Sequence, residues 1–206
     1  MIEWQKTYGG TNEEEFRSII QTNDGGFACS GWSGSNDGDV TGLSGIRDSW
    51  LVKLDENGNI EWQSTLGGPL DERGYTVVQT ADTGYIVSNT SRSSTGDVSA
   101  NYGLDDYWLA KTDSLGAIQW EQNYGGSGDE NTREVIATLD GGYMVVGYTN
   151  SSNVDVTGAH GNDDGWVVKV DNLGAIEWQR ALGGTGIDRI GSVVQEADST
   201  YIVSGF

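Results

Sequence analysis

The stretch GDVTGLSGIRDSWLVKLDENGNIEWQ, residues 38–63, decides the fold because the chain repeats it. Near-copies are GDVSANYGLDDYWLAKTDSLGAIQWE at 96–121 and VDVTGAHGNDDGWVVKVDNLGAIEWQ at 154–179. The IEWQ motif starts at residues 2, 60 and 176, and its variant IQWE at 118, so successive copies are 58 residues apart without insertion. A fixed period of this length predicts a row of similar supersecondary units.

Each unit is predicted to contain four strands and almost no helix. In the first unit we expect strands over 16–22 and 27–33, then a long loop at 34–48 and a third strand over 49–55. The turn ENGN leads into a fourth strand that begins at the IEWQ motif, whose first copy is IEWQKTY at 2–8. Asn-Gly between two apolar runs is a strong hairpin signal. The 32 glycines and single proline also suit short strands joined by tight turns.

The predicted fold is all-β, a β-propeller built from four-stranded antiparallel blades. Apolar residues occupy both faces of the inner strands, so each sheet needs a neighbour on both sides, and a ring provides that for every unit. Residues 1–206 are interpreted as one propeller domain or propeller fragment of about three and a half repeats, namely 2–59, 60–117, 118–175 and a partial unit at 176–206. A two-sheet sandwich is the alternative, although it does not naturally repeat a four-stranded unit. The in-phase tryptophans are expected between blades: Trp4, Trp62, Trp120 and Trp178, and Trp50, Trp108 and Trp166.

Several segments carry a family resemblance that covers the whole chain. GDVTG, DDYWLAK, LDENGNIEWQ and GGTNEEE resemble the tandem propeller repeats of secreted and surface proteins of bacteria. The resemblance implies a non-enzymatic binding or adhesion module, located outside the cell or at its surface as part of a longer chain. A cytoplasmic location stays open, because MIEWQKTYGG lacks the basic start and apolar stretch of a signal peptide. Strand order is also similar to WD40-type blades, whose Gly-His and Trp-Asp signatures this sequence lacks.

The net charge of −20 narrows the range of partners. Nucleic acid is excluded as a partner because binding it depends on cationic side chains. Membrane insertion is not expected either, because the sequence has no apolar run of 18 residues. Solubility, affinity for cations and life in high salt remain as explanations of the charge. The single cysteine, Cys29, is expected to be a small core residue.

The partial fourth unit leaves three outcomes open. The chain forms a four-bladed ring closed by residues 2–8, it is a piece of a longer propeller, or two or more chains share a larger ring. Exposed strand edges favour pairing with something. A homo-oligomer formed through the incomplete fourth blade is therefore one of the predictions.

More than half of the 31 acidic residues fall in the long loops, which are predicted to open on one face. Two positions recur, and their carboxylates are candidate calcium ligands because Ca²⁺ takes oxygen donors from such loops. These candidates are Asp39, Asp48, Asp97, Asp106, Asp155 and Asp164. The alternative is that short Asp side chains bond backbone groups instead. The only histidine, His160, has no second histidine or cysteine to complete a zinc site, and we expect it to be an exposed loop residue.

Two functions remain after this reasoning, and neither is enzymatic, because every candidate acid has repeat-mates whereas catalysis usually needs one differentiated site. The first is a non-catalytic extracellular module that binds a protein or glycan ligand through the acidic loop face, with or without calcium. The second is a structural or assembly protein whose chains combine through open blade edges.

Overall fold

The computed structural model describes residues 2–197 and 200–206, which form fourteen β-strands and no helix. Sheet 1 contains β1 (Glu14–Gln21), β2 (Phe27–Ser33), β3 (Asp48–Leu54) and β4 (Ile60–Leu66). Sheet 2 contains β5 (Glu72–Gln79), β6 (Tyr85–Ser91), β7 (Asp106–Thr112) and β8 (Ile118–Tyr124). Sheet 3 contains β9 (Glu130–Ala137), β10 (Tyr143–Thr149), β11 (Asp164–Val170) and β12 (Ile176–Leu182). Sheet 4 contains β13 (Ile190–Gln195) and β14 (Tyr201–Gly205).

Within each sheet the strands pair antiparallel in chain order. The predicted strand at 27–33 is confirmed, while the strands expected at 16–22 and 49–55 occur at 14–21 and 48–54. The prediction of an all-β chain with almost no helix is therefore confirmed for the described residues. Among these residues there is also no helix with the length and apolarity that crossing a bilayer requires.

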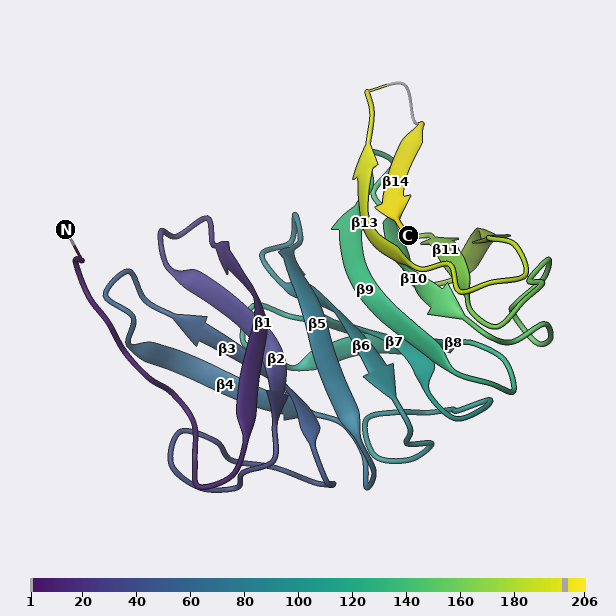
Figure 1. Cartoon of the computed structure of the whole chain (residues 1–206). Coiled ribbons are helices and arrows are strands. Elements are labelled where there is room, and N and C mark those ends of the chain that lie inside the picture. The colour runs from purple at the N-terminus through teal and green to yellow at the C-terminus, as the bar shows by residue number, and fades with distance from the viewer. Residues whose placement is uncertain (1, 198–199) are drawn as a thin grey trace.

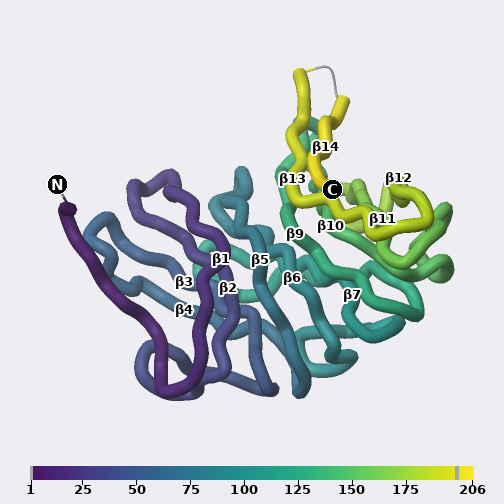
Figure 2. Tube along the Cα trace, in the orientation of Figure 1, coloured from purple at the N-terminus to yellow at the C-terminus, as the bar shows by residue number. Residues whose placement is uncertain are grey.

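The sheets stand side by side in a fan rather than in two facing layers (Figure 1). The first strands of the sheets, β1, β5, β9 and β13, are neighbours in this order. Within the described part of the chain no sheet closes on itself, and the row of sheets is open at both ends, with residues 2–8 at one end and strands β13 and β14 at the other (Figures 1 and 2). A ring closed within one chain by residues 2–8 is therefore not what this chain forms.

Each boundary between adjacent sheets is called a seam here, and the same repeat positions line all three seams. A sheet turns its outgoing face toward the next sheet in the chain and its incoming face toward the preceding one. At the seam between sheets 1 and 2, outgoing Ala28 and Leu51 pack against incoming Val77, Tyr85 and Val87. The two later seams use the corresponding positions. Because successive side chains on a strand point to opposite faces, one apolar strand can serve two seams.

The tryptophans of the third strands are fully buried in this packing. Trp108 packs against Leu66 of the preceding sheet, and Trp166 lies in the cluster that joins sheets 2 and 3. The ring of Trp166 is 4.8 Å from the ring of Tyr107, measured between centroids. The predicted place between neighbouring sheets is therefore confirmed for Trp108 and Trp166, whereas Trp50 is buried within sheet 1 against residues such as Cys29 and Tyr8. The fourth-strand tryptophans are only partly buried and contact a tyrosine of the next sheet, as Trp62 does with Tyr85 at 5.7 Å.

The prediction of a strand at residues 2–8 is wrong, although the segment lies where the fourth strand of a preceding sheet would lie. Trp4 contacts Phe27 at 5.9 Å, as Trp62 contacts Tyr85. Tyr8 donates a hydrogen bond to the carbonyl of Gly58 over 2.6 Å, just as Tyr124 bonds Gly174. Residues 2–8 have no third strand beside them to complete a ladder, so they keep the contacts of a fourth strand without its backbone pairing.

Candidate functional site

The two kinds of long loop meet at the same end of the sheets, as the sequence predicts. The loop before β3 and the loop before β5 bond each other through the Ile46 N–H and the Leu70 carbonyl, 2.7 Å apart. The corresponding bond in sheet 2 joins the Leu104 N–H to the Gly128 carbonyl over 2.8 Å. The tight turns lie at the other end. This loop face is the surface on which the candidate ligands of the sequence fall.

The first recurring aspartate holds a glycine turn. The Oδ2 atoms of Asp39, Asp97 and Asp155 accept hydrogen bonds from the backbone N–H groups of the glycines at 9, 67 and 125, at 3.0, 3.1 and 3.2 Å. The backbone of each aspartate also bonds the carbonyl of the same glycine. These carboxylates thus join two loops through backbone groups. This is the alternative to calcium binding that the sequence left open.

The second recurring aspartate is buried. Asp48, Asp106 and Asp164 are at most 1% exposed. Each Oδ2 atom accepts the N–H of the residue four positions earlier, as Asp106 does from Tyr102 over 2.6 Å. Each Oδ1 atom is buried and finds no hydrogen-bond partner among the described residues. A buried acceptor without a partner raises the free energy of the folded state, and more so if it carries charge.

A third acidic position completes this arrangement, and the sequence reasoning did not single it out. Glu72 and Glu130 are fully buried at the start of their strands. Their Oε1 atoms accept hydrogen bonds from Ser91 and Thr149, and their Oε2 atoms accept the N–H groups of Gly68 and Gly126. The signal that could have found them is the period itself, because an acid recurs at 14, 72, 130 and 188.

These acids converge on the glycine pair at each seam. A Cβ atom built on Gly67 would lie 2.9 Å from both Asp48 Oδ1 and Glu72 Oε2. Gly67 also bonds Asp97, so the structure brings Asp48 and Asp97 to one glycine from successive repeats. The glycine is required because any side chain would collide with the carboxylates.

The pKa values of these carboxyls reflect their burial. Burial, opposed by the Tyr102 N–H and reinforced by the negative charge of Glu130, raises the pKa of Asp106 to about 7. Burial also raises the pKa of Asp48 and that of Glu130. Burial thus favours the protonated form of Asp48, Asp106 and Glu130 relative to an exposed carboxyl, and a neighbouring negative charge adds to this effect at Asp106.

The described residues contain no group of three or more His, Cys, Asp or Glu side chains placed to hold a metal ion. The candidate calcium ligands instead bond backbone N–H groups. His160 has a side chain that is 64% exposed, as expected for a loop residue, and its own N–H bonds Asp164. Cys29 is buried in the core beside Trp50, which confirms its predicted role.

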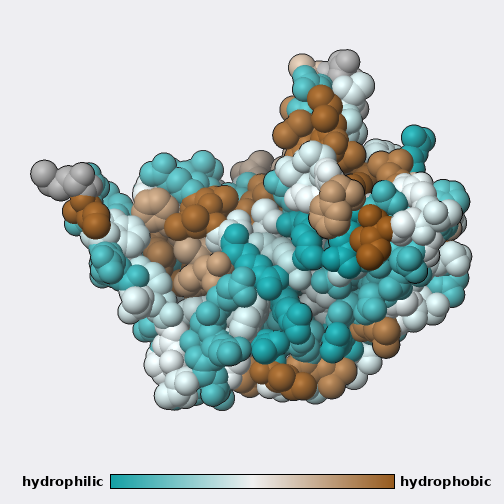
Figure 3. Space-filling model, viewed as in Figure 1, coloured by the Kyte–Doolittle hydropathy of each residue, from teal (hydrophilic) through white to brown (hydrophobic). Residues whose placement is uncertain are grey.

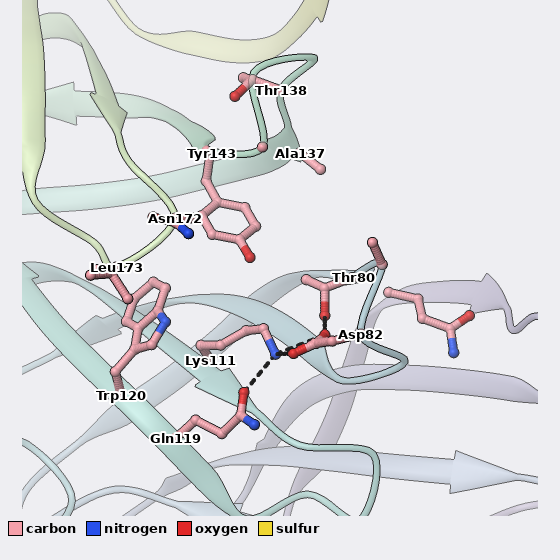
Figure 4. Close-up of a pocket in the computed structure, with 14 residues that line it drawn as sticks. Thr80, Asp82, Lys111, Gln119, Trp120, Ala137, Thr138, Tyr143, Asn172 and Leu173 are labelled. Carbon is pink, nitrogen blue, oxygen red and sulfur yellow. Dashed lines mark hydrogen bonds and ion pairs between the residues drawn. The ribbon is translucent and has the colours of Figure 1, made fainter.

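A hollow of about 470 Å³ lies on the tight-turn side, between sheets 2 and 3 (Figure 4). Lys111 is buried in its wall and bonds Asp82 at 2.8 Å and Gln119 at 2.8 Å. Trp120, beside Lys111, and Tyr143 of sheet 3 also line the hollow. The hydrogen bonds from Lys111 and then Thr80 lower the pKa of Asp82 to about 2. The same lysine recurs as Lys53 and Lys169, each bonded to two acids. A group that recurs in all three four-stranded sheets and bonds a residue of a tight turn has a structural role.

A scan against protein-family models found no matching family. A search of curated proteins found no match either.

Proposed function

We propose that the protein is a non-catalytic, β-propeller-type structural module that works by adding its open ends to further blades of the same kind. One observation carries the proposal: each end of the row exposes apolar side chains at positions that the internal seams bury, namely Ile19 at one end and Val194 and Ile202 at the other. The repeated sheets, each stacked on the next through the same positions, are the arrangement that a propeller uses.

The incoming face of sheet 1 is covered in part by residues 2–8 and open at β1. Ile19 is 60% exposed, whereas its repeat-mates Val77 and Val135 are fully buried. The chemistry of the position is unchanged, because all three side chains are β-branched and apolar. Ile19 is therefore exposed because no preceding sheet lies beside it. The residue type has not changed to one typical of a surface.

The outgoing face of sheet 4 is open in the same way. Ile202 is 56% exposed, whereas its repeat-mates Ile86 and Met144 are fully buried. Val194 on the neighbouring strand is also exposed, and Figure 3 shows hydrophobic surface on the projecting hairpin. Contiguous exposed apolar surface of this kind marks an interaction site.

The loop face supports a second candidate, the binding of a protein ligand outside the cell. Ile46 and Leu104 share one repeat position there, and both are more than half exposed. The acids of this face do not favour a cation-mediated or adhesive role, because Asp39 and Asp97 bond the loop backbone. A screen of protein and glycan ligands, with an Ile46→Ser/Leu104→Ser double variant as control, tests this candidate. Loss of a hit in the double variant would support it, and equal binding would contradict it.

Sedimentation equilibrium tests the assembly function directly. Over concentrations from about 1 to 100 µM we expect the average mass to rise above the 22.1 kDa of one chain. Because each chain carries a net charge of −20, association should strengthen as salt is raised. A mass that stays at 22.1 kDa throughout, in high salt as well, would contradict the proposal.

A further inference from the structure

We infer that the open ends join a second copy of this chain, head to tail. The outgoing face of sheet 4, defined by Ser192, Val194 and Ile202, docks on the incoming face of sheet 1 in the next copy, defined by Ile19 and Gln21. This inference rests on the proposed assembly function and adds the partner, the orientation and the residues. The internal seams supply the template for the junction.

The apolar residues of the two end faces correspond to residues that already meet inside the chain. At the seam between sheets 1 and 2, outgoing Ile20 and Ala28 belong to one cluster with incoming Val77. Their repeat-mates on the end faces are Val194 and Ile202 on the outgoing side and Ile19 on the incoming side. The junction thus brings together three positions that the fold packs together at the first seam, and all three are apolar in the junction as well.

The polar groups of the end faces match as well. Ser18 accepts a hydrogen bond from the Val77 N–H over 3.4 Å, and Glu134 accepts one from Val193 over 2.7 Å. The same repeat position on the outgoing end is Ser192, which has the side chain needed to accept the N–H of Ile19 in another copy. A junction with matched donors and acceptors leaves fewer groups without a partner than an arbitrary contact would.

A second polar contact follows the same rule. The side-chain oxygens of Gln79 and Gln195 accept N–H groups from the β-turn of the preceding sheet, Asn23 at 2.9 Å and Leu139 at 2.8 Å. Gln21 occupies this position on the incoming face of sheet 1, where its side chain is exposed. In the head-to-tail junction Gln21 would face the N–H of Ala197 in another copy, because Ala197 is the repeat-mate of Asn23 and Leu139.

The incoming end already holds part of the junction. Residues 2–8 lie against sheet 1 in the place of a fourth strand, with Trp4 on Phe27 and Tyr8 bonded to Gly58. The β13–β14 hairpin of a second copy supplies first and second strands. Three of the four strand positions that form an outgoing face are then occupied, two from one copy and one from the other.

The orientation follows from the asymmetry of the seams. Each of the three seams joins an outgoing face to an incoming face. A contact that follows this template is heterologous, and such contacts produce closed rings or open filaments. Contact between two incoming faces would instead offer no Ser192 to the N–H of Ile19 and no turn of the outgoing side to Gln21.

A complementation experiment tests the orientation. Ile19→Asp disables the incoming face, and Ile202→Asp disables the outgoing face. Both side chains are more than half exposed in the single chain, so folding should be preserved. In about 0.5 M sodium chloride, each variant alone should associate about 100-fold more weakly than the parent chain, because an unpaired charge would be buried in the junction. Mixed one to one, the two variants should form a complex of two chains and stop there, since one intact pair of faces remains.

Leu139→Asp is the matched control, because Leu139 is 72% exposed in a turn outside both end faces. This variant should associate as the parent chain does. Recovery of a complex in the mixture cannot come from misfolded variants, so the proposal stays testable even if one variant loses stability.

The outcomes separate the partner from the general function. If either variant alone still associates as strongly as the parent chain, the head-to-tail junction is wrong while assembly stands. If the mixture stays monomeric while the parent chain associates, the junction is also wrong. A parent chain that is monomeric under all conditions overturns the junction and the assembly function together.

Discussion

The interior strand β9 and the end strand β1 are repeat-mates, and they show how this molecule obtains its stability. At one position Val135 on β9 is fully buried, while Ile19 on β1 is 60% exposed. Both strands belong to a four-stranded sheet with the same antiparallel pairing. The difference lies in the neighbours, because sheet 3 has a sheet on both sides and sheet 1 has one. Burial here depends on stacking, as in repeat proteins whose stability is a sum over units and the interfaces between them.

The largest expected effect comes from truncating one repeat position in the interior and at the end. Met144→Ala should lower the free energy of unfolding by about 2–5 kcal/mol, because it removes a fully buried side chain and leaves a cavity. The matched change Ile202→Ala should cost less than about 1 kcal/mol in the single chain, since Ile202 is already exposed. Urea denaturation at low protein concentration measures both. Equal losses would show that the ends are packed as tightly as the seams.

A smaller effect is expected from the buried carboxyl of Asp106, whose pKa is raised to about 7. Because the pKa of Asp106 is higher in the folded than in the unfolded state, protonation of this carboxyl stabilises the fold. The stabilisation is complete below the unfolded-state pKa of about 3.8. This contribution is lost as the pH rises from about 4 through 7. Asp106→Asn cannot ionise and can donate to Glu130, so at pH 8 it should be more stable than the parent by about 2 kcal/mol.

The measurement is the free energy of unfolding of both chains between pH 5 and 8. The difference between them should shrink toward low pH, which separates Asp106 from the effect of the net charge of −20. Glu56→Gln, in an exposed turn, serves as the control for the removal of one charge. A destabilised Asp106→Asn chain at pH 8 would mean that the ionised carboxylate is favoured at this seam.

The same hydrogen bond, from a glycine N–H to a loop aspartate, can be compared at an interior seam and at the open end. Asp97→Ala removes the acceptor of the Gly67 N–H at a seam and should cost about 1 kcal/mol. Asp39→Ala removes the corresponding bond to Gly9 at the open end, where water can replace it, and should cost less. Thermal unfolding of the two variants gives the ranking. A larger loss of stability for Asp39→Ala than for Asp97→Ala would contradict this ranking and indicate that Asp39 has a further role.

The smallest expected effect concerns calcium. Because the six candidate carboxylates bond backbone groups, millimolar calcium should shift the melting temperature by less than about 1 °C. Repeating the scan after treatment with a chelator gives the reference. A rise of several degrees that disappears in Asp97→Asn would instead make these carboxylates ligands.

Much of the fold could be predicted from the sequence, because the repeat period reports the unit directly. Strand 27–33 and the buried tryptophans follow from alternation and turn chemistry, which are local. The state of residues 2–8 could not be predicted in this way. Their sequence is that of a fourth strand, and only the absence of a third strand beside them decides that they form none.

The candidate site was predicted only by residue type. The sequence correctly places Asp48 and Asp97 on one face. It does not predict that they meet at Gly67 or that Glu72 completes the group. These contacts join successive repeats across a seam, and the packing of two sheets determines them. The raised pKa of Asp106 likewise depends in part on the charge of Glu130 in the next sheet.

Hydrogen exchange followed by mass spectrometry, at low and high protein concentration, tests most directly whether the two ends form a seam of the internal kind. We predict that peptides from β1 and from the β13–β14 hairpin gain protection together at high concentration, while those from β5 and β9 are protected at both concentrations. Protection that appears on the loop face instead, or on one end without the other, would contradict the account.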